Sequence, residues 1–310
     1  MKVLGVYLTV PFFIHRNTNE WGAFLMSTAI SQYVGIFRCP ICQAAMRNVP
    51  ATSLVCNNHH CFDLSKHGYV HLATRTYKTK YDKQLFSARR AIMEQGFFDP
   101  LYDVLSEVIL QTTEPEESQM YVLDAGCGEG YHLTQVRQRV MQASQVPIIG
   151  VGVDLAKEGV MLAAKNDSEV VWCVGDLTNA PFVDRQFPYI LNLLSPSNSD
   201  EFHRLLADEG QMIKVIPEAN YLRELREVLY QETPKTQYEN HRTIDHFKTS
   251  FQLIGKERVQ YQFRLDEEGL ASLLQMTPLV WGATPEQLER VSSLAGVDMT
   301  IDLVVLIGRK

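Results

Sequence analysis

The sequence predicts an α/β protein with a mostly parallel, seven-stranded sheet, preceded by a small metal-binding module. Two observations lead to this prediction. From residue 120 onward, strand-like apolar segments alternate with amphipathic helical segments, and such alternation is typical of a parallel sheet covered on both faces. Four of the six cysteines lie between residues 39 and 61, in a segment too short to build a core without a metal.

By composition, the 310-residue chain divides into an extension, a small module, a basic linker with helices, and a large domain. We place these segments at residues 1–36, 37–76, 77–115 and 116–310. The extension contains an apolar run, Val3–Ile14, that is too short to cross a membrane as a helix. We interpret it as the product of an upstream start codon, with Met26 as the candidate true start.

Each element follows from a local pattern. Short apolar runs predict strands at Met120–Asp124, Ile148–Asp154, Val170–Val174, Phe187–Leu194, Gln211–Ile216, Gln260–Leu265 and Met299–Ile307. Apolar residues at helical spacing predict helices at Phe86–Met93, Leu101–Leu110, Gly130–Gln142, Ala156–Lys165, Asp200–Leu206, Tyr221–Gln231, 266–275 and 284–294. Two strand-like segments lie in the small module, Ser53–Val55 and Tyr69–Leu72.

The charge of the chain is unevenly distributed. The net charge of −7 argues against nucleic-acid binding over the whole surface. Residues 37–100, however, carry nine Lys/Arg against four Asp/Glu, whereas residues 101–310 carry a net −13. A basic segment joined to an acidic body is typical of a nucleic-acid-binding arm on a catalytic domain. A charge asymmetry without function is the alternative.

The cysteine cluster predicts a structural zinc site in a reducing compartment. In Cys39-Pro-Ile-Cys42, two thiolates reach one ion from a tight turn, and Cys56 supplies a third ligand. The spacing leaves the fourth ligand open between His59, His60 and Cys61. Four protein ligands leave no open position for water, so the expected role is structural. A reduced cluster without metal is the alternative.

A glycine-rich loop follows the first strand of the large domain and opens a helix. It reads Asp124-Ala-Gly126-Cys-Gly128-Glu129-Gly130, and its glycines allow a tight turn and close approach of a ligand to the backbone. NAD-binding loops hold phosphate, whereas this acidic loop suits a cation. S-adenosylmethionine carries an ammonium and a sulfonium and no phosphate. The loop therefore predicts a Rossmann-like class I methyltransferase rather than a dehydrogenase.

Two further acids stand at the ends of the next two strands. Asp154 is placed to accept the ribose hydroxyls of the cofactor, and Asp176 to accept the adenine amino group. Ligands bind outside the carboxyl ends of parallel strands, so we expect both acids to face one crevice with Asp124. Each acid taken alone could instead be a helix cap or a turn residue.

Several motifs outside the loop narrow the class further. They are Cys39-Pro-x-Cys42, Cys56-x3-His60-x-Phe62-Asp63, Lys66-x-Gly68-Tyr69-Val70-x-Leu72, Ala88-Arg89-Arg90-Ala91, Gly96-x3-Pro100-Leu101, Asp124–Tyr131 and Leu273–Pro278. Together they resemble the RlmA-type 23S ribosomal RNA guanine-N1 methyltransferases over residues 37–310. The combination of cysteine module, Arg-Arg helix and late Gln-Met-Thr-Pro stretch is more specific than any one motif.

The resemblance implies ligands for the metal and for the cofactor. The family's zinc set maps onto Cys39, Cys42, Cys56 and His60. Its cofactor loop maps onto Gly128 and Glu129, and an aromatic residue near the cofactor maps onto Phe98. Relatives usually have His where this chain has Tyr221, near the methionine end of the cofactor.

Another departure concerns the acceptor. Before Asn198 the chain reads Ser195-Pro-Ser197 where other members have Ala-Pro-Cys, which indicates the type II, Gram-positive, macrolide-linked subgroup with a neighbouring target guanine. The resemblance also implies 23S rRNA as partner, the bacterial cytoplasm as location, no membrane association, and a link to antibiotic resistance. A homodimer is the oligomer that we consider.

Guanine N1 must lose a proton during methylation, yet residues 192–198 contain no carboxylate or His to accept it. We take Asn192 and Asn198 as the catalytic candidates, because their amides could hydrogen-bond the guanine edge; turn-forming residues are the alternative. Reaching N1 requires an unpaired or flipped base. The expected phosphate contacts are Lys78, Lys80, Lys83, Arg89 and Arg90.

Two other functions stay open at this point. One is a methyltransferase for a small molecule or a protein, with the zinc module as docking element. The other is a non-enzymatic zinc protein that binds RNA.

Overall fold

The computed structural model describes residues 29–49, 52–75, 80–113, 119–230, 239–292, 294 and 296–310. Most of the expected extension at 1–36 lies outside these residues, as does Lys78. None of the described helices is long and apolar enough to cross a membrane.

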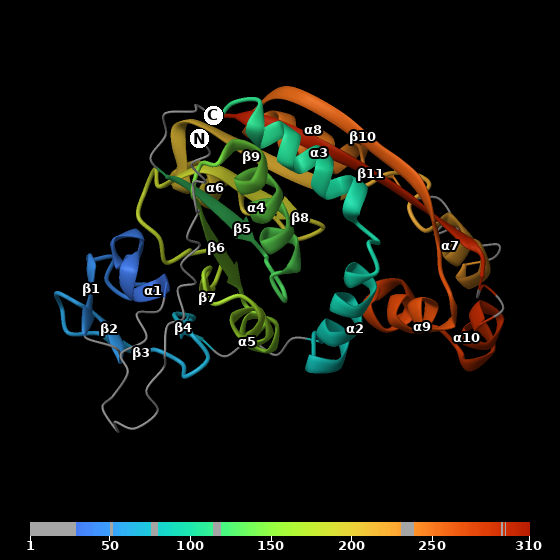
Figure 1. The fold of residues 1–310 in the computed structure, drawn as a ribbon, viewed down its shortest axis with the longest axis horizontal. Coiled ribbons are helices and arrows are strands. Elements are labelled where there is room, and N and C mark those ends of the chain that lie inside the picture. Colours follow the sequence, from blue (N-terminus) through green and yellow to red (C-terminus); the bar gives the residue numbers. More distant parts are fainter. Residues whose placement is uncertain are drawn as a thin grey trace, which may run out of the picture.

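Eight strands form one sheet in the order β10-β11-β9-β8-β5-β6-β7-β4 (Figure 1). They are β4 (Tyr69–His71), β5 (Met120–Ala125), β6 (Ile148–Asp154), β7 (Val171–Val174), β8 (Phe187–Leu193), β9 (Leu206–Pro217), β10 (Gln252–Arg264) and β11 (Asp298–Arg309). Neighbours from β4 to β9 run parallel, and β11 is antiparallel to β9 and β10. The parallel core agrees with the prediction. The sheet exceeds the expected seven strands because β4, from the small module, pairs with β7.

Helices cover both faces of this sheet. Successive strand residues alternate between two apolar cores, as with Leu123 in one core and Val122 in the other. The core that contains Val122 is closed by α3 (Asp99–Leu110), α4 (Tyr131–Ser144) and α5 (Lys157–Asn166). The core that contains Leu123 is closed by α1 (Ala29–Gln32), α6 (Ser199–Leu205) and α8 (His241–Ser250).

Further helices form a cap beside the sheet. In Figure 1, α2 (Lys83–Glu94) lies against α9 (Glu267–Met276), and α7 (Arg223–Leu229) lies against α10 (Pro285–Ser292). A short 3-10 turn, η3 (Pro278–Val280), follows α9. Helix α2 begins at Asp82, whose carboxylate accepts a hydrogen bond of 2.8 Å from the Leu85 N–H and so satisfies one of the free donors of the first turn.

The small module is a three-stranded antiparallel sheet of β1 (Met46–Val49), β2 (Ser53–Cys56) and β3 (Cys61–Asp63), entered from the 3-10 turn η1 (Val34–Ile36). It is attached to the large domain at several points. Phe37 forms a β-bridge with Phe182, and the Asn179 side chain donates to the Pro40 carbonyl at 3.0 Å. Together with β4, these contacts fix the module at the β7 edge of the main sheet.

Several elements differ from the sequence prediction: β9 begins at Leu206 where Gln211 was expected, and α1, β1 and β3 were not predicted. Helix α8 was not expected, because Ile244 and Phe247 are its only buried residues and two apolar side chains give a weak period. Strand β10 begins at Gln252, well before the expected Gln260, since it lies at the sheet edge and most of its residues are at least partly exposed.

Candidate active site and metal centre

The glycine loop turns sharply between β5 and α4. Gly126 and Gly130 have φ values of +93° and +80°, in the left-handed region that favours glycine. A Cβ on Gly126 would lie 2.0 Å from Ser195 Oγ, and one on Gly130 would lie 2.3 Å from the Trp172 ring. The loop is therefore in direct contact with the segment after β8 and with β7, and side chains at these two positions would separate them.

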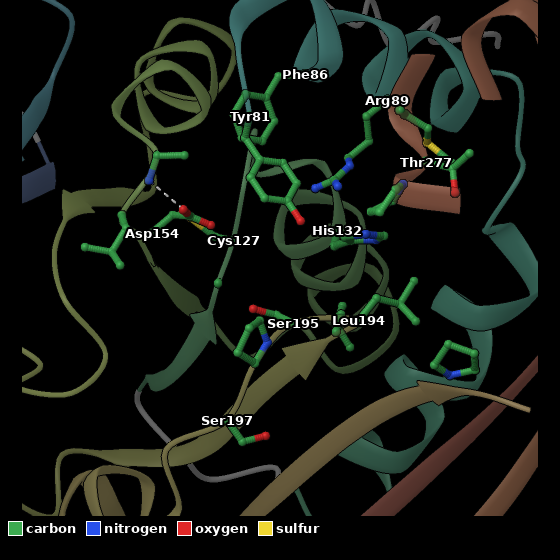
Figure 2. A pocket seen from close by; sticks show the side chains of 18 of the residues that line it. Tyr81, Phe86, Arg89, Cys127, His132, Asp154, Leu194, Ser195, Ser197 and Thr277 are labelled. Carbon is green, nitrogen blue, oxygen red and sulfur yellow. Dashed lines mark hydrogen bonds between the residues drawn. The ribbon is translucent and has the colours of Figure 1, made fainter. Parts of the chain in front are cut away.

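A cavity of about 750 Å³ lies between this loop and the helical cap (Figure 2). Its wall comes from the ends of β6, β8 and β9 and from α2, α4 and the Gln-Met-Thr-Pro stretch. The volume suits an organic cofactor together with part of an acceptor. The expected cofactor residues that line it are Phe98, Gly126, Asp154, Asp176 and Tyr221.

Asp154 and Asp176 face the cavity from the strand ends, and both also shape their local turns. The Asp154 carboxylate accepts hydrogen bonds from the backbone N–H groups of Gly128 at 2.9 Å and Ala156 at 2.7 Å. Asp176 Oδ1 accepts from the N–H and the hydroxyl of Thr178, both at 2.8 Å.

Asp124 and Glu129 are buried in the glycine loop. Each is 1% exposed, and their carboxylate oxygens have no hydrogen-bond partner among the described residues. Burial raises the pKa of both carboxyl groups, and for Glu129 the Arg89 guanidinium, 3.8 Å away, opposes this rise. Buried carboxylates without partners are costly, so a cationic ligand would stabilise this region. The positively charged ammonium and sulfonium of S-adenosylmethionine fit these hydrogen-bond acceptors.

The side-chain amides of Asn192 and Asn198, the two predicted catalytic residues, both bind backbone groups. Asn192 is fully buried and does not line the cavity; its Nδ2 donates to the carbonyls of Ala125 at 2.8 Å and Pro196 at 3.0 Å. Asn198 lines the cavity, but its Oδ1 accepts from the Glu201 N–H at 3.1 Å and caps α6. Both side chains therefore hold the backbone of the loop after β8.

Arg89, which we expected to contact RNA, is directed into the cavity (Figure 2). Its guanidinium lies 5.7 Å from the centre of the Phe86 ring and beside Glu129. The sequence contained a signal for this orientation. Arg89 follows buried Phe86 by three residues and precedes buried Met93 by four, a spacing that places all three on the inner face of α2.

Other lining residues were not foreseen. The His132 side chain of α4 is buried, and burial lowers its pKa to about 3, so the imidazole is neutral. Met276 and Thr277 come from the Gln-Met-Thr-Pro stretch. The resemblance singled out that stretch without giving it a role, and the structure places it in the cavity wall.

The predicted zinc ligands meet in the small module. The ligand atoms of Cys39, Cys42, Cys56 and His60 lie within 4.8 Å of one another. The Cys42 and Cys56 sulfurs are 3.7 Å apart, and the Cys56 sulfur is 3.4 Å from His60 Nδ1. A tetrahedral zinc ion with bonds of about 2.3 Å to sulfur sets its sulfur ligands about 3.8 Å apart, so these positions fit it. Cys61 is exposed and outside the cluster.

The described basic residues of the predicted arm separate into two groups. Lys80 and Lys83 are exposed at the start of α2. Arg90 is only partly exposed, pairs with Glu94 at 2.8 Å and lies 5.3 Å from the Tyr131 ring centre. With Arg89 directed into the cavity, Lys80 and Lys83 are the members of the described set that are open to a polyanion.

Comparisons with known proteins agree with this geometry. A zinc-ribbon family model, described as the N-terminal part of RlmA, matches residues 37–77, and a methyltransferase-domain model matches residues 116–266. One relative is YxjB of Bacillus subtilis (strain 168), named as a candidate 23S rRNA (guanine-N(1)-)-methyltransferase. It is 41% identical to this chain over 277 residues, which are 89% of this chain and 97% of YxjB. The chain belongs to the RlmA family. The 23S rRNA (guanine(748)-N(1))-methyltransferase of Streptomyces fradiae is 29% identical to this RlmA-family chain, over 89% of the chain and 97% of that protein.

As a member of the RlmA family, the chain is an S-adenosylmethionine-dependent methyltransferase with a structural zinc ion. The predicted family, fold class, cofactor and metal are confirmed. The roles of individual side chains stay predictions.

Proposed function

We propose that this RlmA-family chain transfers a methyl group from S-adenosylmethionine to N1 of a guanine in a 23S rRNA hairpin. The observation that carries the proposal is that two features occur together around the main sheet. One is a cavity beside buried carboxylates that lack hydrogen-bond partners. The other is a zinc-ligand cluster in a module attached to the same sheet. The names of the relatives support the choice of acceptor.

The cofactor residues would divide the ligand between them. When bound, S-adenosylmethionine supplies an electrophilic methyl group. Asp154 would accept the ribose hydroxyls and Asp176 the adenine amino group, while Asp124 and Glu129 offset the positive charge at the methionine end. The remaining members of the set would shape and line the site: Phe98, Gly126, Gly128, Gly130 and Tyr221.

The acceptor must enter the cavity as a single base. N1 of a paired guanine takes part in base pairing, so the nucleotide has to be unpaired or turned out of its stack. In this proposal the zinc module of residues 37–76, with Lys80 and Lys83, holds the RNA backbone while the domain of residues 116–310 receives the base. Methyl transfer is an in-line displacement, so the protein contributes mainly by positioning the two reactants and excluding water.

Primer extension across 23S rRNA tests the function. N1-methylguanine blocks base pairing, so RNA from cells that carry the gene should stop reverse transcriptase at one guanine, and the stop should vanish on deletion. Purified protein with S-adenosylmethionine should restore the stop on RNA from the deletion strain. The proposal is contradicted if protein that binds S-adenosylmethionine methylates no guanine in that RNA, or if it methylates a small molecule or a protein instead.

A further inference from the structure

A second cavity, of about 530 Å³, shares a wall with the cofactor cavity. The wall is the loop after β8, Leu194–Ser197, together with Pro217. Ser197 lines both cavities, whereas Lys214 of β9 lines only the second. The loop that faces the acceptor therefore has a buried lysine on its other side.

Lys214 is held by oxygen atoms and has no counter-ion. Its side chain is 6% exposed, and Nζ lies 2.5 Å from Asn192 Oδ1, 2.6 Å from Ser197 Oγ and 3.2 Å from the Ser195 carbonyl oxygen. Among the described residues, no carboxylate pairs with it. Burial lowers its pKa to about 8, because an ammonium group is poorly solvated there. A neutral amine is thus accessible close to neutral pH.

The hydrogen bonds around Lys214 can be complete in both of its protonation states. As an ammonium, Lys214 donates to all three oxygens, and Ser197 donates its hydroxyl hydrogen to Asn192 Oδ1, 3.1 Å away. As a neutral amine, Lys214 donates two hydrogens, to Asn192 and the Ser195 carbonyl, and its lone pair accepts the Ser197 hydrogen. Only the hydroxyl hydrogen of Ser197 changes partner between the two states.

We propose that Ser197 and Lys214 form a relay that accepts the N1 proton of the acceptor guanine. This inference rests on the proposed function and supplies the proton acceptor that the loop after β8 lacks. As the N1–CH₃ bond forms and the N1–H bond breaks, Ser197 Oγ takes the proton and passes its own hydrogen to Lys214 Nζ. Charge balances, because the sulfonium becomes a neutral sulfide while Lys214 becomes an ammonium.

The second cavity allows Lys214 to return the proton to water between turnovers. Arg242 and His246 of α8, both exposed, line it together with Lys214, and no acid is among its described lining residues. On the neighbouring strands the partners of Lys214 are Asn192 and Leu306, which are uncharged. Burial disfavours the ammonium, so the relay is set to release its proton.

Single-turnover methylation of unmodified 23S rRNA, measured against pH with cofactor and RNA saturating, tests the relay. The wild-type rate should rise with pH through about pH 8 and level off above it, as Lys214 becomes fully neutral. Ser197→Ala and Lys214→Met should lower the rate at pH 7 by about 10²–10⁴-fold, the usual contribution of a positioned base. Their rates should keep rising above pH 8, because only solvent base then removes the proton. Ser197→Thr keeps the hydroxyl and should restore the dependence on pH that Ser197→Ala loses, whatever its absolute rate.

Lys214→Arg separates proton transfer from loop positioning. Arginine keeps a positive charge and hydrogen-bond donors but does not give up its proton in proteins. The relay requires that Lys214→Arg be as slow as Lys214→Met while both bind S-adenosylmethionine with wild-type affinity. A wild-type rate in Lys214→Arg, or a plateau near pH 8 in Ser197→Ala, overturns the relay.

A measurement without cofactor or RNA completes the test. In protein labelled with ¹³C at lysine Cε, one resonance should titrate near pH 8 and be absent from Lys214→Met. The relay is overturned if that resonance titrates at the ordinary lysine value. If wild-type protein fails to methylate guanine N1, the proposed function fails. If it methylates N1 and Lys214→Arg matches it, only the relay fails.

Discussion

The contact between the glycine loop and the loop after β8 can be tested by adding one methyl group. Gly126 has a φ of +93°, and a Cβ there would lie 2.0 Å from Ser195 Oγ. Left-handed backbone at a non-glycine residue costs about 1–2 kcal/mol. Forcing a methyl group into a packed contact costs about 1–3 kcal/mol more. We therefore expect Gly126→Ala to lower the free energy of unfolding by about 2–5 kcal/mol.

Ser195→Gly removes the atom that the new methyl group meets and leaves the backbone strain in place. Urea unfolding of the wild type, both single variants and the double variant forms a double-mutant cycle. In the Ser195→Gly background, Gly126→Ala should cost only the backbone share, about 1–2 kcal/mol. The coupling free energy should therefore be about 1–3 kcal/mol, with the double variant more stable than the sum of the two single effects predicts. Strictly additive effects would refute the reasoning, because they would mean that the two loops do not share this contact.

Four further predictions concern the metal, the cofactor, the pH dependence of unfolding and the RNA. Cys42→Ser should lose the bound zinc and unfold the small module, whereas Cys61→Ser should keep one zinc per chain by metal analysis; zinc loss from Cys61→Ser would contradict the ligand set. Asp124→Asn should weaken S-adenosylmethionine binding about tenfold or more in calorimetry, since it removes a charged partner. In the folded, cofactor-free wild type the pKa of Asp124 is raised. The free energy of unfolding should therefore fall as pH rises from the ordinary aspartate pKa toward the raised one. Asp124→Asn should lack this pH dependence in urea unfolding, and equal pH slopes in the two proteins would contradict the prediction. Replacing both Lys80 and Lys83 by Ala should reduce the salt slope of rRNA binding by about 0.7–0.9 per lysine, measured by filter binding, and an unchanged slope would remove these residues from the interface.

Much of the fold was accessible from the sequence because its parallel strands are buried on both faces. Short, continuous apolar runs rich in β-branched residues, such as Ile148–Asp154, are typical of such strands. Strand β10 at the sheet edge and helix α8, with two buried residues, contain no such run. The predicted β10 was therefore too short, and α8 was not predicted. Strand β4 could be recognised as a strand, but three residues contain nothing that says which sheet they join.

The site was predictable where position along a strand determines it. Asp154 and Asp176 follow strand ends and therefore face the cavity. Arg89 was assigned from its charge alone, although its helical spacing places it on the inner face of α2. Lys214 was overlooked because it stands in an apolar strand, where a lone lysine signals a special environment only once burial is known. Asn192 has the side chain of a recognition residue but is enclosed by the backbone that it supports.

The attachment of the small module sets the distance between that module and the cavity. The bridge at Phe37, the hydrogen bond to Pro40 and the pairing of β4 with β7 attach the module to the large domain at three places. Under the proposed function, the module that would hold the RNA and the cavity that would receive the base then stay at a constant separation. The proposed function then predicts that the enzyme selects its guanine by distance along the folded RNA rather than by reading neighbouring bases. Adding one base pair to the target hairpin should therefore abolish methylation of the original guanine, and methylation that persists there would show that the base itself is recognised.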